Sequence, residues 1–303
     1  MSRHRKFVER KFKGMSADYA RALNKEAVPL CPLCMKPFVL QPASHRLPTA
    51  EHSIPSCVGG TLSTGVVTCK GCNSTDGSSE DVALQRAMFG LDFVSGKGSI
   101  PAVIQNASGR IAADVEWSNP VTIRVRDGRS NNPAAFNGLK AQIRPDGIIT
   151  MAFHFGFSAE AYWRACLRVS YLIAFGHFGY AYVLGDGAAQ VRRILDGGPV
   201  PEGLILEAFP NGQIDSQAVI HLLGDAIFVM FRVTTHSTRW LAVPLPGGSG
   251  TDWEVLHNLY RAAERLKMDV AGQGGNPNVE IRFARDPVMR AWNIGRSFGP
   301  SNR

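Results

Sequence analysis

Two Cys-x-x-Cys pairs constrain the fold of this chain more than any other feature of its sequence. Two thiolates three positions apart can reach one tetrahedral ion from a tight turn, and a second such pair completes a four-cysteine site. A redox Cys-x-x-Cys would instead occur singly, at the start of a helix that follows a buried strand. We therefore predict a structural Zn2+ that compensates for the small core of this segment. Its ligands would be Cys31, Cys34, Cys69 and Cys72.

The bulk composition is that of a globular protein. The chain has 303 residues, of which 45% are hydrophobic, enough for one large domain or two of ordinary size. It contains no run of eighteen apolar residues and no apolar segment after its N-terminal charges, so neither a membrane span nor a secretory signal is expected. We expect a cytoplasmic protein with no membrane partner, in which cysteines bind metal rather than form disulfides.

The positive charge is concentrated beside the cysteines. Residues 1–50 contain ten lysines and arginines against three acidic residues, within a formal net charge of +8. This excess favours a polyanion such as DNA or RNA as partner, through phosphate neutralisation. The alternative is a solvated basic arm that aids solubility. The candidate DNA-binding residues are Arg3, Arg5, Lys6, Arg10, Lys11, Lys13 and Lys70.

Residue patterns predict an α+β protein in two parts, with a boundary between residues 95 and 96. Helices are expected over 15–27 with Ser16 as cap, from near Cys72 to about Phe89, over 158–179 with Ser158 as cap, and over 251–269 with a Thr251–Glu254 capping box. Strands are expected over 110–117, 121–126, 147–155, 218–223, 226–234 and 239–245. The second part, 96–303, is therefore predicted as a larger mixed α/β domain with mainly antiparallel strands, which targets, regulates or binds a partner.

The segment between the cysteine pairs contains groups that a structural zinc module does not need. Glu51 and His52 are adjacent, and Asn73 directly follows the fourth cysteine. Neighbours on a strand face opposite sides, but a strand end or a bend lets one bind metal while the other addresses a water. The simpler alternative is a structural histidine beside a solvated carboxylate, in a module that only binds nucleic acid or protein.

The ordered combination of these residues resembles an HNH endonuclease of the zinc-stapled ββα-metal type. Cys-x-x-Cys is followed by Glu-His-x-x-Pro-x-x-x-Gly-Gly-Thr and then by Val-Val-x-Cys-x-x-Cys-Asn. Phage Holliday-junction resolvases and many bacterial defence and restriction nucleases are of this kind. The match covers roughly residues 28–80, so the resemblance implies a zinc-stapled HNH domain with the basic arm in residues 1–95.

The resemblance also implies roles for individual residues. Glu51 and Asn73 would be ligands of a catalytic Mg2+ or Mn2+, because carboxylate and amide oxygens form a hard, water-filled shell. His52 would be the general base that takes a proton from the attacking water, a role that suits imidazole. The metal would stabilise charge on the scissile phosphate and the leaving oxygen.

Two positions depart from the family pattern. The middle Asn of the motif would fall at Ser63 or Thr64, where a hydroxyl can supply part of the loop support, and Asp76 stands where Lys or Arg is common. Outside the motif, Arg164 and Arg168 lie four apart on a predicted helix. They could line a phosphate path, although such arginines more often pair with acids.

Together these features predict an HNH-type endonuclease that nicks or cleaves DNA, most readily double-stranded DNA. An anti-phage defence or restriction system with protein partners is the expected setting. One alternative is a non-catalytic, zinc-stapled DNA-binding or complex-forming subunit, and a further alternative is an RNA-cleaving HNH nuclease.

Overall fold

The computed structural model divides the chain into two compact units, Met1–Gln85 with Ser158–Arg303, and Arg86–Phe157. The four cysteines therefore belong to the same unit as residues 158–303, a division that differs from the predicted one at 95/96. The structure describes residues 3–106, 108–116, 122–125, 133–142, 158–201, 204–224, 226–248, 253, 256, 265–269, 278–285 and 287–288.

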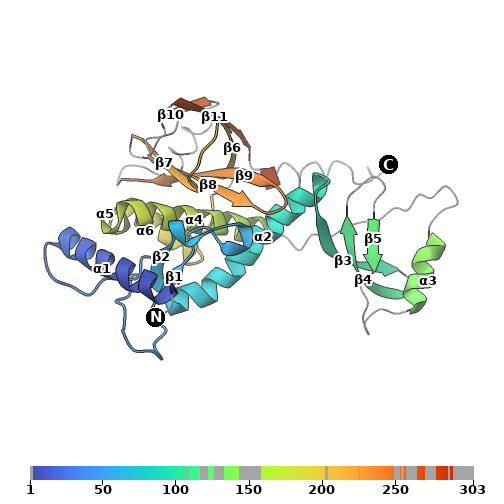
Figure 1. Cartoon of the computed structure of the whole chain (residues 1–303), viewed down its shortest axis with the longest axis horizontal. Helices are drawn as coiled ribbons and strands as arrows, with labels where there is room; N and C mark the ends of the chain where they lie inside the picture. The colour runs from blue at the N-terminus through green and yellow to red at the C-terminus, as the bar shows by residue number, and fades with distance from the viewer. Residues whose placement is uncertain are drawn as a thin grey trace. The chain divides into compact units, whose positions relative to one another are not determined.

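A six-stranded antiparallel sheet forms one layer of the larger unit (Figure 1). Its strand order is β10-β11-β6-β9-β8-β7. The strands are β6 (Leu206–Asn211), β7 (Ala218–Leu223), β8 (Ala226–Thr234), β9 (Thr238–Pro246), β10 (Arg265–Asp269) and β11 (Asn278–Arg285). Strand β8, which lies between β9 and β7, is buried on both faces from Ala226 to Phe231, and this explains its continuous apolar run.

Helices α4 (Ala159–Phe178), α5 (Tyr180–Val183) and α6 (Asp186–Leu195) form the next layer. Helix α4 packs on β8 and β9, and α6 packs on β9. Ser158 caps α4 as predicted, because its side chain accepts a hydrogen bond from the amide of Ala161. Most of α4 is buried, which accounts for its apolar character on all sides.

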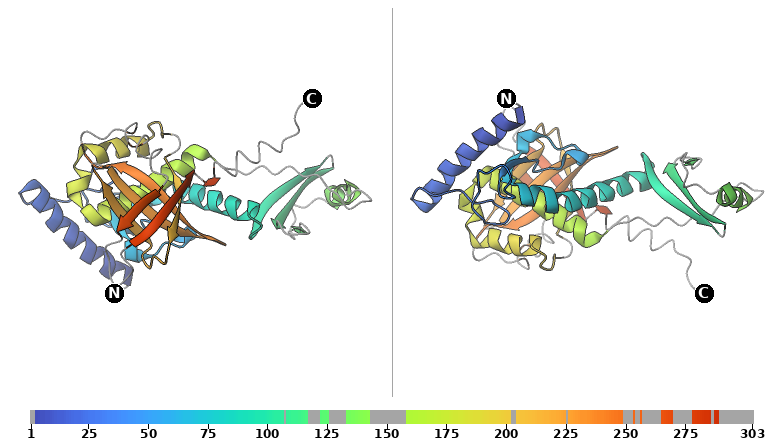
Figure 2. Two further views of the ribbon diagram at one scale, coloured as in Figure 1. Left: turned by 90° about the horizontal axis from the view of Figure 1, so that it is seen from above. Right: turned by 90° about the horizontal axis from the view of Figure 1, so that it is seen from below.

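The two strands of the cysteine-containing segment lie on the side of these helices away from the sheet (Figure 1). Strands β1 (Pro48–Glu51) and β2 (Val66–Cys69) pair antiparallel, and β2 leads through the π-helical turn Cys72–Asp76 into α2 (Gly77–Val94). Helix α1 (Arg3–Leu23) contacts β1, β2 and α5, as Figure 2 also shows.

The described part of the smaller unit contains the C-terminal end of α2, a three-stranded antiparallel meander and a further helix. Its other elements are β3 (Ser99–Asn106), β4 (Gly109–Glu116), β5 (Thr122–Val125) and α3 (Pro133–Gln142). Ile111 of β4 packs with Ala135 of α3, so the helix covers one face of the meander. None of the described helices in either unit has the length and apolar character needed to cross a membrane.

Three predicted helices differ from the structure. The helix predicted from near Cys72 to about Phe89 begins as the π-helical turn and continues as α2 to Val94. Helix α1 begins at Arg3 rather than near Ser16, whose hydroxyl instead donates to the Phe12 carbonyl inside the helix. Phe12 and Tyr19 lie seven residues apart on one face and are half-buried and buried, and Phe7 is half-buried as well, so tertiary packing continues the helix back through the basic residues.

The predicted helix over 251–269 is wrong at its C-terminal end. Residues 265–269 form strand β10 and pair with β11, because a neighbouring β-branched strand offers pairing that overrides local helix propensity. The Thr251–Glu254 capping box and the predicted strand over 147–155 lie outside the described residues. The predicted mixture of helix and sheet is confirmed, and every described strand pair is antiparallel.

Candidate metal centre and adjoining site

The four cysteines converge on one point. Their sulfur atoms all lie within 4.8 Å of one another, and three of the four residues are buried. Cys31 and Cys34 lie on the loop after α1, where Met35 adopts a left-handed φ of 55° that tightens the turn. Cys69 ends β2, and its amide donates to Cys31 Sγ at 3.4 Å. Four soft sulfur ligands in a closed cluster could bind a metal ion such as zinc.

Protons are shared unequally among the thiols. Hydrogen bonding with Cys31 lowers the pKa of Cys34 to about 7 and also lowers the pKa of Cys69. Hydrogen bonding with Cys34 raises the pKa of Cys31, and hydrogen bonding with Cys31 raises the pKa of Cys72. Without a cation, the four groups cannot all be thiolates at neutral pH. A bound divalent metal would release the remaining protons, which fits a metal centre.

Tyrosines from α4 and α5 hold the first cysteine turn in place. Tyr171 Oη donates to the carbonyl of Pro32 at 2.6 Å, and Tyr180 Oη donates to the carbonyl of Leu30. Burial raises the pKa of Tyr171 to about 12, so this phenol stays protonated as a donor. The turn carrying Cys31 is therefore an integral part of the larger unit.

The predicted site residues meet where β1 ends and the turn after β2 begins. Asn73 Nδ2 donates to the Ala50 carbonyl at 2.8 Å and to Thr49 Oγ1 at 3.2 Å. These bonds place Asn73 beside the strand that carries Glu51 and leave its carbonyl oxygen Oδ1 as the atom it can offer to a ligand. His52, half-buried, directly follows β1. The structure thus brings Glu51, His52 and Asn73 to one region.

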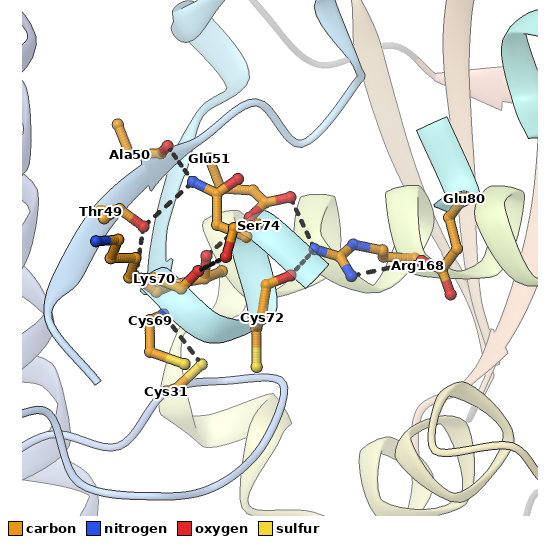
Figure 3. Close-up of polar contacts among 12 residues, drawn as sticks. Cys31, Thr49, Ala50, Glu51, Cys69, Lys70, Cys72, Ser74, Glu80 and Arg168 are labelled. Carbon is orange, nitrogen blue, oxygen red and sulfur yellow. Dashed lines mark hydrogen bonds and ion pairs between the residues drawn. The ribbon is translucent and has the colours of Figure 1, made fainter. Parts of the chain in front are cut away.

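Glu51 has partners that the sequence did not reveal. The residue is only 5% exposed; its Oε2 accepts from Thr68 Oγ1 at 2.8 Å, and its Oε1 lies 2.9 Å from Arg168 Nη2. Arg168 also donates to the Cys72 carbonyl at 3.0 Å and lies 3.4 Å from Glu80 Oε2 (Figure 3). Both carboxylate oxygens of Glu51 are therefore hydrogen-bonded within the protein.

The two arginines of α4 pair with acids rather than forming a phosphate path. Arg168 is 5% exposed, and its guanidinium is bound to Glu51, Glu80 and the Cys72 carbonyl. Arg164 pairs with Glu160 at 2.6 Å and donates to the Gly198 carbonyl. The helical spacing of the two residues was visible in the sequence. Their partners were not, because Glu51 lies 117 residues from Arg168.

The loop between β1 and β2 is clamped from the sheet. Gln217 donates through Nε2 to the Gly59 carbonyl at 2.9 Å, and its Oε1 accepts from Thr61 Oγ1 at 2.8 Å and from the Thr61 amide at 3.2 Å. Thr64 Oγ1 donates to the Thr61 carbonyl at 3.2 Å, a bond within the loop it was predicted to support. A Cβ at Gly60 would lie 1.7 Å from the Ile54 carbonyl oxygen, so the loop path requires glycine there.

The predicted DNA-binding residues fall into several environments. Lys6, Arg10 and Lys13 are exposed on α1 at i, i+4 and i+7, so they share one face. Arg5 pairs with Glu9 at 3.1 Å, and Lys11 is half-buried over the Phe7 ring, where burial lowers its pKa. Lys70 is exposed immediately after Cys69, whereas the side chains of Arg3 and Asp76 lie outside the described residues.

The chain is thus a mixed helix-and-sheet protein with a four-cysteine cluster that could bind a metal ion such as zinc. No protein-family model, curated protein or solved structure matches it. The functional argument therefore depends on the motif and on the geometry around the cysteines.

Proposed function

We propose that this protein is a zinc-stapled endonuclease of the HNH type that nicks or cleaves DNA by phosphodiester hydrolysis. The observation that carries the proposal is the bond from Asn73 Nδ2 to the Ala50 carbonyl. It links the residue after the fourth cysteine of the cluster to the strand that ends in Glu51 and is followed by His52. The antiparallel pair β1–β2 and the following helix supply the order of elements that the motif requires.

The donor atoms at this point fit a hard divalent cation such as Mg2+ or Mn2+. Asn73 can offer Oδ1, and each carboxylate oxygen of Glu51 keeps a lone pair beyond its one hydrogen bond. Ligating carboxylates are commonly held by such donors. When bound, the metal would neutralise charge that develops on the scissile phosphate and the leaving oxygen.

His52 is the general base in this proposal. His52 directly follows β1 and is adjacent to Glu51 in the chain, and in this proposal its imidazole would take the proton of the attacking water. The clamp that Gln217 places on Gly59 and Thr61 limits the motion of the loop that follows His52 and so helps to keep the imidazole in position.

The exposed basic face of α1 would hold the phosphate backbone. Lys6, Arg10 and Lys13 share this face, and α1 itself packs against both strands of the hairpin. A duplex bound along α1 would therefore pass close to the end of β1. The binding energy would come mainly from phosphate neutralisation, without selection of sequence.

A second candidate is favoured by the ion pair between Arg168 and Glu51. A guanidinium beside the carboxylate already neutralises it and competes with a metal for the same oxygen. In this alternative the protein is a non-catalytic zinc-stapled subunit that binds DNA or assembles with other proteins. The two candidates share the zinc centre and the basic helix but differ in whether the protein hydrolyses DNA.

A plasmid-nicking assay separates the candidates. The full-length protein is incubated with supercoiled DNA in Mg2+, Mn2+ or EDTA, beside His52→Ala and Asn73→Ala, with His221→Ala in β7 as matched control. The nuclease proposal expects metal-dependent nicking, lost by about 100-fold or more in the first two variants and retained in the control. Wild-type protein that is inert in every metal would exclude the nuclease proposal, whereas a fully active His52→Ala would exclude His52 as the general base. A parallel RNA substrate tests the RNA-cleaving alternative.

A further inference from the structure

Arg168 connects three parts of the candidate site through one buried side chain. Its Nη2 donates to Glu51 Oε1 and to the carbonyl of Cys72, and its Nη1 faces Glu80 of α2. The guanidinium is planar and rigid, so these bonds fix the position of Glu51 relative to Cys72. Cys72 is a candidate metal ligand, and the next residue is Asn73.

We propose that Arg168 is the positioning residue of the site, which holds the Glu51 carboxylate at a fixed place relative to Asn73 so that the two can bind one divalent cation. The inference rests on the proposed function and adds to it a residue from α4, outside the HNH motif. It gives a role to the charged side chain that lies among the mostly apolar buried residues of α4.

The local charges favour positioning over simple neutralisation of Glu51. Arg168 faces two buried carboxylates, Glu51 and Glu80, with Asp81 close enough to interact with both Glu51 and Arg168. Arg168 therefore bridges more than one acidic group instead of serving Glu51 alone. A lone arginine placed only to cancel Glu51 would not also need Glu80 beside it.

Hydrogen-bond geometry supports the same conclusion. Thr68 Oγ1 donates a hydrogen bond to one carboxylate oxygen of Glu51, and Arg168 Nη2 donates to the other. The two bonds together fix the plane of the carboxylate. A carboxylate held by two donors keeps its remaining lone pairs in fixed directions. Such support is what a metal ligand requires if it is to be pre-organised.

The test measures Mn2+ binding to the zinc-loaded, full-length protein by electron paramagnetic resonance, with plasmid nicking as a second readout. The variants are Arg168→Gln, Arg168→Lys and, as matched control one helical turn away, Arg164→Gln. Zinc content and circular dichroism establish that each variant is folded. We expect Arg168→Gln to weaken Mn2+ binding by about 10- to 100-fold, Arg168→Lys to recover part of it, and Arg164→Gln to stay within about twofold of the wild type.

The outcomes separate this inference from the function it rests on. If the wild type binds Mn2+ and nicks DNA while both Arg168 variants bind Mn2+ as tightly or more tightly, the positioning role is overturned and the nuclease proposal stands. If the wild type itself neither binds Mn2+ nor nicks, the proposed function fails and the inference fails with it. Should Arg168→Gln not fold, Arg168→Lys decides: weaker binding supports the inference, and unchanged binding overturns it.

Discussion

Arg168 Nη2 lies 2.9 Å from Glu51 Oε1, and both side chains are only 6% exposed. The pair joins the α4 helix to the strand β1 across 117 residues of sequence. An ion pair this deep is stable only if each charge keeps its partner, because neither group can turn to water. The candidate site and the helical layer therefore depend on each other for stability.

Removal of Arg168 should strongly destabilise the fold. Arg168→Met leaves Glu51 and Glu80 buried without their cation, so we expect the free energy of unfolding to fall by about 3–5 kcal/mol. Arg5→Gln, which breaks the exposed pair with Glu9, should cost less than about 0.5 kcal/mol. Urea denaturation followed by circular dichroism measures both. Equal, small losses in the two variants would show that the buried network contributes little.

Local features of the sequence predicted local structure well. Strands β7 and β8 begin and end where the β-branched runs do, and the Ser158 cap is present. The cysteine pairs converge as their spacing requires. The strand pattern and the cap depend on residues that are close together in the sequence. Each cysteine pair likewise places two ligands three positions apart, and the need of one metal ion for four ligands predicts that the two distant pairs meet.

Features that depend on distant residues could not be predicted. Nothing near Glu51 indicates Arg168, and nothing near Thr61 indicates Gln217, because each contact exists only after α4 and the sheet have packed on the hairpin. The same cause explains why the early start of α1 at Arg3 was not predicted. Nothing in its basic sequence indicated that Phe7 and Phe12 would pack on the rest of the protein and anchor a helix. Tertiary packing decided these elements against local propensity.

Loss of one cysteine ligand should remove the metal and loosen the fold. Cys34→Ser takes one sulfur from the four-cysteine cluster, so we expect zinc content to fall from about one per chain toward zero and Tm to fall by roughly 10 °C. Cys57→Ser, at an exposed cysteine outside the cluster, is the matched control. Elemental analysis and differential scanning calorimetry provide the measurements. A folded wild-type protein without metal would contradict the zinc assignment.

The carboxyl of Asp81 should make stability depend on pH. Burial, and then the charge of Glu51, raise its pKa to about 6 from 3.8, against the opposing effect of Arg168. The folded state binds this proton more tightly than the unfolded state, so the stabilisation is complete below about pH 4 and is lost as pH rises through about 6.

Asp81→Asn, which mimics the protonated form, should therefore be more stable than the wild type above pH 6. The expected difference is about 1 kcal/mol, because the carboxyl is half-buried and solvent screens part of the interaction. It should shrink toward pH 4. Denaturation curves at several pH values, with Asp215→Asn as an exposed control, test this, and a difference independent of pH would contradict it.

Neutralisation of the basic face of α1 should weaken the proposed binding of DNA in a salt-dependent way. Changing Lys6, Arg10 and Lys13 together to Gln removes up to three phosphate contacts, so the slope of log affinity against log salt should become shallower by about 2 to 3. Fluorescence anisotropy with a DNA duplex at several salt concentrations gives the slope. The charge-matched control replaces three exposed basic residues of the smaller unit, namely Lys97, Arg110 and Arg124. Equal losses in the two triple variants would indicate attraction by overall charge alone.

Gln217 should hold the loop between β1 and β2 closed. Its side chain makes three hydrogen bonds to Gly59 and Thr61, including one that protects the Thr61 amide. Gln217→Ala leaves this amide to water, so we expect its hydrogen exchange to quicken by at least about tenfold and protease cleavage in the loop to increase. Gln213→Ala, which removes only a bond to Asp215 on the surface, is the matched control.

Because the clamp lies outside the cysteine cluster, zinc content should remain unchanged. Unaltered exchange at Thr61 in the Gln217 variant would mean that the hydroxyl bonds of Thr61 and Thr64 support the loop without help from the sheet.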